Sequence, residues 1–278
     1  MTHLYPSISE IFIRSLPVHT EAAFHSRISA FADHDVTGYV HTLPQIGGIL
    51  ITADLVPYLI PPEVITDNNL ATGDKVTAAV AYSRQYDRHV VVGLGKIVRV
   101  RYDEIGLVRS KSTFDIDKHK TKFGDTVLMQ GKKLKDILRF IPNDCFKIVL
   151  SLDKKIVSTE KLNYCTHLTY SNRDKITICL LAFFKAKELA MQKKNVVLVV
   201  DSLDKMFHVY NNCMADDGVI DPAHISLGAV TDFESIICSG GAIKDGGSLT
   251  VIGLHNAGTT PAHKYITDRL LQICDVII

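Results

Sequence analysis

The sequence predicts an α/β protein in which a small β-barrel precedes a mostly parallel sheet flanked by helices. Two observations lead to this fold class. Between about residues 36 and 101, short segments rich in Val, Ile and Thr follow one another, as in a small barrel. From residue 126 onward, strand-like and helix-like segments alternate, which indicates a doubly wound sheet.

The first half of the chain divides into three expected parts. Residues 1–35 place short apolar clusters at helical spacing and predict a short helical N-terminal segment. Residues 36–104 form the expected barrel. Residues 105–125 are polar and charged, so we expect a linker there. The predicted barrel strands are 36–43, 48–53, 75–82 and 89–100.

The second half, residues 126–278, contains the most informative segment of the chain. The run from Asn195 to Asp201 is apolar and ends in a carboxylate, followed by the hydroxyl of Ser202. A buried parallel strand with this ending delivers an acid to the C-terminal edge of a sheet, where nucleotide-binding α/β domains hold their ligands. Other strands are predicted at 126–129, 147–152, 163–169, 248–254 and 275–278. Helices are predicted at 134–141, from residue 171 onward, after the strand at 195–201 as far as residue 211, and near 227–238 and 262–272.

Composition sets limits on location and partners. The hydrophobic content of 46% supports a packed core, and the net charge of +1 excludes a global basic field for nucleic acid. Six widely separated cysteines predict reduced thiols rather than a zinc site or a disulfide framework. No signal peptide or membrane-length apolar run is visible, so we expect a cytoplasmic protein with no membrane association.

Two groups of residues resemble the family of the transcription termination factor Rho. In the second half these are Asp201-Ser202-Leu203, Tyr210-Asn211 and Asp245-Gly-Gly-Ser-Leu-Thr-Val-Ile252. In the barrel they are Leu43-Pro44, Gly48, Leu50, Pro62, Leu70 and Thr72-Gly73-Asp74. The resemblance covers residues 36–278. It implies an RNA-binding OB-type barrel of the cold-shock kind followed by a RecA-like ATPase domain.

The resemblance also implies which residues should hold nucleotide, and several of them differ here. Gly131 and Lys132 lie where the phosphate-binding loop belongs, but the loop is short and Lys133 occupies the position of the hydroxyl that ligates Mg²⁺. Lys154 stands where the family has its catalytic carboxylate, while Asp201 remains as the acid on the metal side. The family's arginine finger falls beyond the position that matches Ile278, so we expect it to be missing.

The expected RNA surface is altered as well. The strand at residues 47–51 carries neither the aromatic side chains nor the arginine that the resemblance implies. The candidate nucleic-acid residues are Tyr58, Arg84, Tyr86 and Arg88, and an ordinary polar loop explains the last three equally well. We therefore expect weak binding that is insensitive to base identity and sensitive to salt.

The sequence favours a Rho-like protein with an inactive ATPase core that acts as an RNA-binding or regulatory module in transcription. It leans against an enzyme and names no catalytic residue and no metal ligand. The residual nucleotide site is Gly131, Lys132 and Asp201, and ATP with Mg²⁺ is a cofactor only if that site still binds it. Partners would be single-stranded RNA, transcription machinery or an authentic Rho, and the chain is expected as a monomer or small oligomer. Two alternatives stay open: an active RNA-dependent ATPase and translocase, and a protein-interaction scaffold with no nucleic-acid role.

Overall fold

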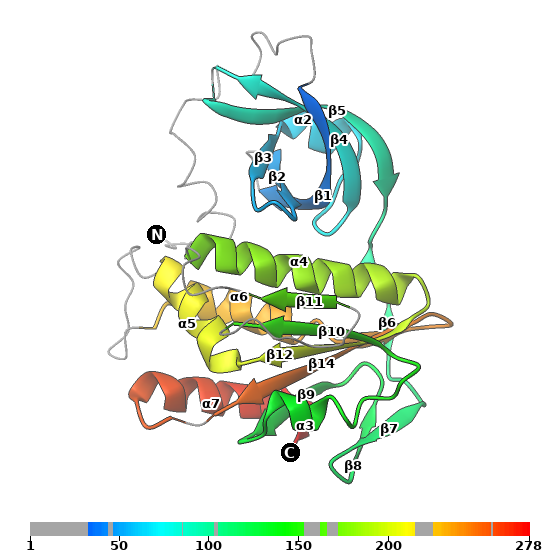
Figure 1. Ribbon diagram of the computed structural model, residues 1–278, viewed down its shortest axis with the longest axis vertical. Helices are drawn as coiled ribbons and strands as arrows, with labels where there is room; N and C mark the ends of the chain where they lie inside the picture. The colour runs from blue at the N-terminus through cyan, green and yellow to red at the C-terminus, as the bar shows by residue number, and fades with distance from the viewer. Residues whose placement is uncertain are drawn as a thin grey trace. The chain divides into compact units, whose positions relative to one another are not determined.

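A computed structural model describes most of the chain in two compact units. The described residues are 33–43, 47–84, 86–102, 105–152, 162–165, 172–214, 225–256 and 258–278. One unit ends at Arg101, and the other begins at Tyr102 and runs to the C-terminus (Figure 1). The helices expected before residue 33 lie outside the described residues.

The first unit contains a closed barrel with strand order β1-β2-β3-β5-β4. Buried and partly exposed residues alternate along most of β4, so one face of that strand lines the barrel interior. Gly47, at the start of β2, has φ of +108° and no room for a side chain, because a Cβ atom would lie 2.2 Å from the carbonyl oxygen of Ile60. The elements are β1 (His34–Leu43), β2 (Gly47–Thr52), β3 (Pro57–Ile60), α2 (Pro62–Asp67), β4 (Lys75–Ser83) and β5 (Arg88–Val98).

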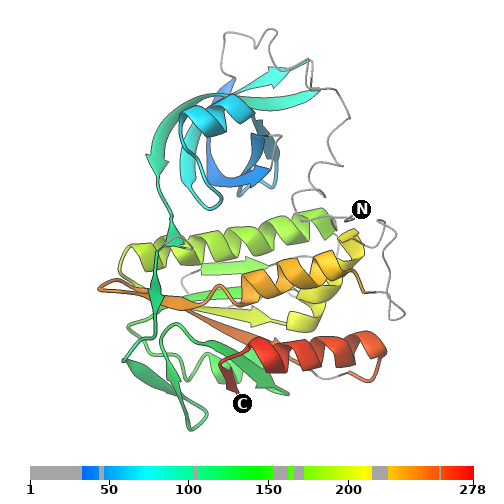
Figure 2. The same cartoon turned by 180° about the vertical axis from the view of Figure 1, so that it is seen from behind.

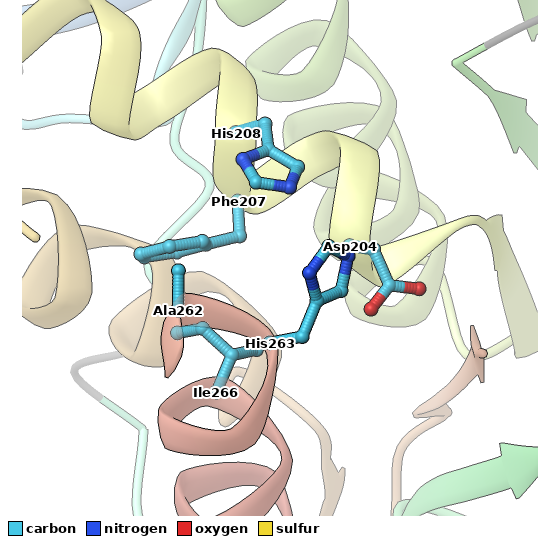
Figure 3. A pocket seen from close by; sticks show the side chains of 6 residues that line it. All are labelled: Asp204, Phe207, His208, Ala262, His263 and Ile266. Carbon is cyan, nitrogen blue, oxygen red and sulfur yellow. The ribbon is translucent and has the colours of Figure 1, made fainter. Parts of the chain in front are cut away.

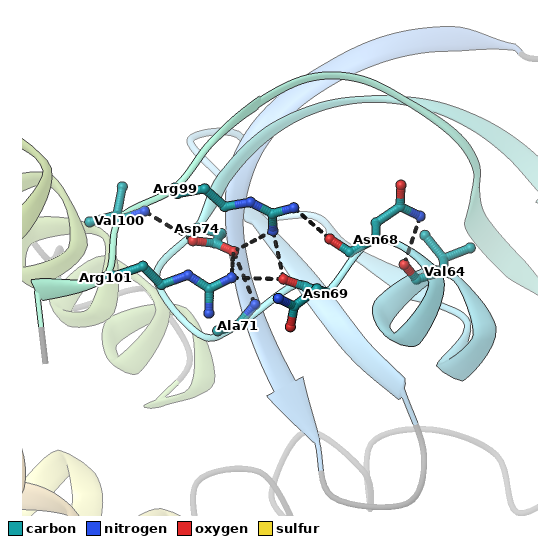
Figure 4. Close-up of polar contacts among 8 residues, drawn as sticks. All are labelled: Val64, Asn68, Asn69, Ala71, Asp74, Arg99, Val100 and Arg101. Atoms are coloured by element: carbon teal, nitrogen blue, oxygen red, sulfur yellow. Dashed lines mark hydrogen bonds and ion pairs between the residues drawn. The ribbon is translucent and has the colours of Figure 1, made fainter. Parts of the chain in front are cut away.

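A buried carboxylate, Asp74, is the centre of a polar network beside β4 and β5 (Figure 4). The side chain of Asp74 is 0% exposed and forms ion pairs with Arg99 at 3.1 Å and Arg101 at 3.0 Å. It also accepts backbone N–H groups from Ala71 at 3.0 Å and Val100 at 2.9 Å. The two guanidinium groups in turn donate to the carbonyl oxygens of Asn68 and Asn69. This network ties the end of β5 to the turn that precedes β4.

The second unit is built on a sheet whose central strands are all parallel. The order is β11-β10-β12-β14, and β9 and then β15 follow on the far side of β14. Strand β13 pairs antiparallel with β14 on the side where β9 lies, and β13 pairs in turn with β6. The strands are β6 (Leu107–Val108), β9 (Thr126–Gln130), β10 (Phe146–Ser151), β11 (Leu162–Cys165), β12 (Asn195–Asp201), β13 (Gly241–Ile243), β14 (Ser248–His255) and β15 (Val276–Ile277).

Four longer helices cover one face of this sheet, as the view from behind shows most clearly (Figure 2). They are α4 (Asn172–Met191), α5 (Leu203–Met214), α6 (Leu227–Ile237) and α7 (Pro261–Ile273). An ion pair between Arg269 and Glu234 joins α7 to α6. Helix α3 (Leu134–Ile137) packs on the opposite face, where it is shorter than the predicted 134–141 because the chain turns at residues 138–141. None of the helices in the described segments is long and apolar enough to cross a membrane.

The segment 105–125, which we expected to be a linker, belongs to the second unit. Its residues form β6 and a hairpin of β7 (Thr113–Ile116) and β8 (His119–Lys122). Phe114, Ile116 and Phe123 are buried in the cluster that contains Val127 and Met129 of β9. The prediction failed because a hairpin with one solvated face has a polar average composition. Only every second residue of β7 is buried.

Candidate functional site

The C-terminal edge of the sheet is the place where an open parallel sheet binds ligands. There Asp201 of β12 pairs in register with Leu254 of β14, and His255 pairs with Gln130 of β9. The end of β14 therefore lies between the acid Asp201 and the loop that begins at Gly131. The predicted nucleotide residues do gather along one edge, with the last residue of β14 between them.

The loop after β9 comprises residues 131–133, and α3 begins directly after it. Gly131 adopts a left-handed conformation with φ of +65°, and its N–H donates to the carbonyl oxygen of His255 at 3.1 Å. Lys133 is already the N-cap of α3, and its side chain makes no capping hydrogen bond. Because α3 has only four residues, it adds little dipole to the loop.

Lys132, the lysine expected to contact phosphate, is paired within the protein. Its Nζ lies 2.5 Å from Oδ2 of Asp117, at the tip of the β7–β8 hairpin. Asp117 has φ of +46°, so the turn itself carries the carboxylate toward the lysine. The hydrogen bond and the charge of Lys132 hold the pKa of Asp117 below its usual value. An anion that binds Lys132 would have to compete with this carboxylate.

The acidic side of the edge contains Asp201 and Ser202. Ser202 is buried, and its hydroxyl accepts the backbone N–H of Lys205 at 3.4 Å, so it serves the first turn of α5. Within the described parts of the chain, no three His, Cys, Asp or Glu side chains form a group that could hold a metal ion. Lys154, in the place of the catalytic carboxylate, lies outside the described residues.

Three residues that the sequence analysis missed meet beside Asp201. Asp204 lies in the first turn of α5, His255 ends β14, and Thr267 lies on α7. Oδ1 of Asp204 is 2.6 Å from Nδ1 of His255, and Nε2 of the same ring is 2.8 Å from the hydroxyl of Thr267. The sequence did offer two signals: Asp204 follows Asp201 by three residues, and a histidine ends an otherwise apolar strand.

Next to this group, a small pocket lies between α5 and α7 (Figure 3). Its empty volume is about 170 Å³, and its lining is mainly apolar. The rings of His208 and His263 meet edge to face with centroids 5.2 Å apart. Burial and the neighbouring His263 lower the pKa of His208, and the nearby Asp204 opposes this effect. The pocket lining comprises Asp204, Phe207, His208, Ala262, His263 and Ile266.

The four predicted nucleic-acid residues fall into two environments. Arg84, Tyr86 and Arg88 lie on or beside the turn between β4 and β5, where Arg84 is exposed and the other two are half-buried. Tyr58 is only 3% exposed and belongs to the barrel core. Strand β3 thus turns this predicted nucleic-acid residue toward the barrel core. Burial and Asp54, which accepts its hydroxyl hydrogen bond at 3.1 Å, raise the pKa of Tyr58.

Tyr58 belongs to a cluster of four rings, together with His34, Tyr82 and His89. His89 is 6.1 Å from Tyr58, 5.7 Å from Tyr82 and 5.7 Å from His34, measured between ring centroids, and each contact is edge to face. Tyr82 is 43% exposed, and His89 and His34 are partly or fully open to solvent. Pairing of β4 with β5 places Tyr82 opposite His89, so the strand register explains the cluster. This cluster was not predicted, since two of its members are histidines on different strands.

Three carboxylates line the ring cluster. Tyr82 donates its hydroxyl hydrogen to Asp87, and Tyr58 donates to Asp54. Asp33 accepts the backbone N–H of Tyr82 at 2.7 Å and lies 3.6 Å from His89. Strand β2, by contrast, is buried along its whole length, so its aliphatic side chains face no ligand. The rings and acids therefore form the chemically richer surface of the barrel.

The fold defines a protein with a five-stranded barrel and an α/β unit built on a mostly parallel sheet. Solved structures support this class. The ATPase EscN of the enteropathogenic E. coli type III secretion system has a TM-score of 0.52 at 16% identity, over 68% of this chain and 53% of its own. A prototypical ATPase from the type III secretion system of pathogenic bacteria has a TM-score of 0.55 at 16% identity, over 66% and 62%. The chain thus shares the RecA-like ATPase fold.

Among curated sequences, this chain shows weak homology to the transcription termination factor Rho. Transcription termination factor Rho of Cereibacter sphaeroides is 19% identical over 238 residues, which are 69% of this chain and 56% of that protein. Rho of Borreliella burgdorferi is 26% identical over 138 residues, or 47% and 26%. The chain spans about half the length of the first relative and about a quarter of the second. No family model matches the sequence.

Proposed function

We propose that this chain is a Rho-like module that binds single-stranded RNA weakly through an OB-type barrel and does not hydrolyse ATP. The observation that carries the second part is the phosphate loop. Three residues separate β9 from α3, Lys132 is paired with Asp117, and Lys133 stands in the place of the metal hydroxyl. A phosphoryl-transfer site works by positioning and by charge stabilisation, and this loop offers neither to a nucleotide.

The RNA part rests on the barrel surface. Arg84 and Arg88 supply positive charge beside the ring cluster, and the exposed ring of Tyr82 offers a stacking surface. The surrounding carboxylates can accept hydrogen bonds from base amino groups, but they also repel phosphate. Net affinity is therefore low. In this proposal the chain acts in the cytoplasm as a monomer or small oligomer and regulates transcription machinery or an authentic Rho.

The test is a titration of single-stranded RNA against the full chain at two salt concentrations. We expect binding of oligo-C and oligo-A to be similar, and to weaken strongly between about 50 and 200 mM salt. Replacing Arg84 and Arg88 together by alanine should reduce the slope of log K against log salt by about 1.4, since each phosphate contact contributes about 0.7 on single strands. Tyr82→Ala should weaken binding by about 5- to 100-fold through lost stacking.

A matched control removes the same charge elsewhere. Lys244 and Lys264 are both exposed on the second unit, and replacing both by alanine should leave the slope unchanged. Tight and selective binding of oligo-C at 200 mM salt would contradict weak, base-insensitive recognition. Absence of binding at about 50 mM salt would contradict RNA binding altogether and favour a scaffold.

A further inference from the structure

Two cysteines that lie far apart in the sequence end two neighbouring helices of the second unit. Cys238 is the C-cap residue of α6, and Cys274 is the C-cap residue of α7. Both are free thiols, and Cys238 is exposed while Cys274 is half-buried. Packing of α6 against α7 therefore decides whether the two thiols can meet, which their spacing in the sequence could not reveal.

Contacts on both sides of the two cysteines hold the ends of the helices together. About one turn before the cysteines, Arg269 of α7 donates two hydrogen bonds to the carboxylate of Glu234 of α6, at 2.6 and 2.8 Å. Beside the cysteines, Thr126 at the start of β9 binds both helix ends. Its hydroxyl donates to the carbonyl oxygen of Ile237 at 3.2 Å, and its own carbonyl oxygen accepts the N–H of Asp275 at 2.9 Å. The two helices thus run in the same direction and end at the same residue of the sheet.

The two thiols also share one electrostatic environment. Burial raises the pKa of Cys274 to about 12, and the nearby Cys238 and Asp275 add to the rise. Burial, Glu234 and Asp275 raise the pKa of Cys238 as well. The charge of one thiol can raise the pKa of the other only where the two side chains are near each other. This agrees with the hydrogen bonds that hold both helix ends on β9.

We propose that Cys238 and Cys274 form a modification site, at which a small disulfide such as oxidised glutathione converts the two thiols into a cross-link between the ends of α6 and α7. The thiolate of the exposed Cys238 attacks one sulfur of the small disulfide, forms a mixed disulfide and releases one small thiolate. The thiolate of Cys274 then attacks Sγ of Cys238 and releases the second. The two cysteine protons pass to the two released thiolates, so the protein loses two electrons and the small disulfide gains them. This site goes beyond the proposed function and depends on neither RNA nor ATP.

The raised pKa values determine how fast this cross-link forms and how long it lasts. Because the thiolate is the attacking species, little of either cysteine is reactive near pH 7, and the reaction should speed up about tenfold for each pH unit below the pKa. Thiols with a high pKa are also poor leaving groups, so the disulfide resists reduction once it has formed. The pair is therefore suited to a slow and durable cross-link.

Peptide mapping of the folded full chain after incubation with oxidised glutathione at about pH 8.5 tests the proposal. Trypsin releases residues 206–244, which contain Cys213 and Cys238, and residues 270–278, which contain Cys274. We expect these two peptides to be joined with the loss of two hydrogen atoms, and to separate again after reduction. If Cys238 carries glutathione while Cys274 stays a separate thiol, the two side chains do not reach each other and the proposal fails. It fails equally if both thiols stay unmodified after prolonged incubation.

Two serine variants assign the cross-link to its cysteines. Cys213→Ser is the matched control and should keep the linked peptides, whereas Cys238→Ser should lose them. Oxidation of the native chain should raise the midpoint of thermal unfolding by about 6–12 °C, because the disulfide closes a long loop, and it should leave the midpoint of Cys238→Ser unchanged. A link that Cys238→Ser retains, or one that forms only after the chain is unfolded in urea, would show that the fold does not hold Cys238 and Cys274 together.

Discussion

Replacing Asp74 by alanine is expected to destabilise the barrel by about 3–5 kcal/mol, because it leaves a buried network of charges without its centre. The carboxylate is wholly buried and serves two guanidinium groups and two backbone N–H groups (Figure 4). Without it, the N–H groups of Ala71 and Val100 lose their acceptor in the interior, and each such loss costs about 1–3 kcal/mol. Asp74→Asn keeps one acceptor oxygen and should lose less.

Amide hydrogen exchange followed by mass spectrometry measures this effect within the barrel itself. Peptides from β1 to β5 should exchange about 100- to 4,000-fold faster in Asp74→Ala, since each 1.4 kcal/mol is a factor of ten. Peptides from β10, β12 and β14 should be unaffected. Asp67→Ala, at an exposed position on α2, is the matched control and should cost less than about 0.5 kcal/mol. Unchanged exchange in Asp74→Ala would show that the network does not stabilise the barrel.

Truncating Phe123 to alanine is expected to cost the second unit about 3–5 kcal/mol, as for other buried aromatic side chains. Its ring lies 4.8 Å from that of Phe114, between centroids, and both pack against β9. The loss therefore combines lost burial with a cavity beneath the β7–β8 hairpin. Such a result would show that residues 105–125 contribute to the core of this unit.

Urea unfolding followed by far-ultraviolet circular dichroism gives the free energy directly. The control variant is Leu107→Ala in the same segment, where the side chain is already 40% exposed and should contribute little. If Phe123→Ala and Leu107→Ala cost the same small amount, the segment behaves as the linker that its composition predicts. A much larger cost for Phe123→Ala supports its place in the sheet unit.

The regular parts of the fold were predictable because their hydrophobic pattern is strong. The strand from Asn195 to Asp201 is buried at its five central positions, and such a run has few alternatives to a central parallel strand. Helix α4 was predicted from residue 171 onward by apolar residues at helical spacing. The hairpin at 113–122 was missed because alternate residues of β7 face solvent. Its two buried apolar residues, Phe114 and Ile116, are too few to show the alternation that is typical of a strand.

The candidate site was less predictable, for reasons that lie in tertiary structure. Gly131, Lys132 and Asp201 could be placed on one edge from the order of strands. The partner of Lys132 could not, because Asp117 arrives from a hairpin that had been assigned to a linker. Asp204, His255 and Thr267 come from three separate elements, and only packing brings them together. The ring cluster likewise depends on the register of β4 and β5.

ATP turnover with and without single-stranded RNA is the decisive measurement for the claim that this chain does not hydrolyse ATP. We expect the purified chain with Mg²⁺ to show no RNA-stimulated release of phosphate above background, because Lys132 is occupied by Asp117 and Lys133 cannot ligate the metal. Asp201→Asn should then give the same background as the native chain. Phosphate release that RNA stimulates and that Asp201→Asn abolishes would contradict the claim and would show a working ATPase.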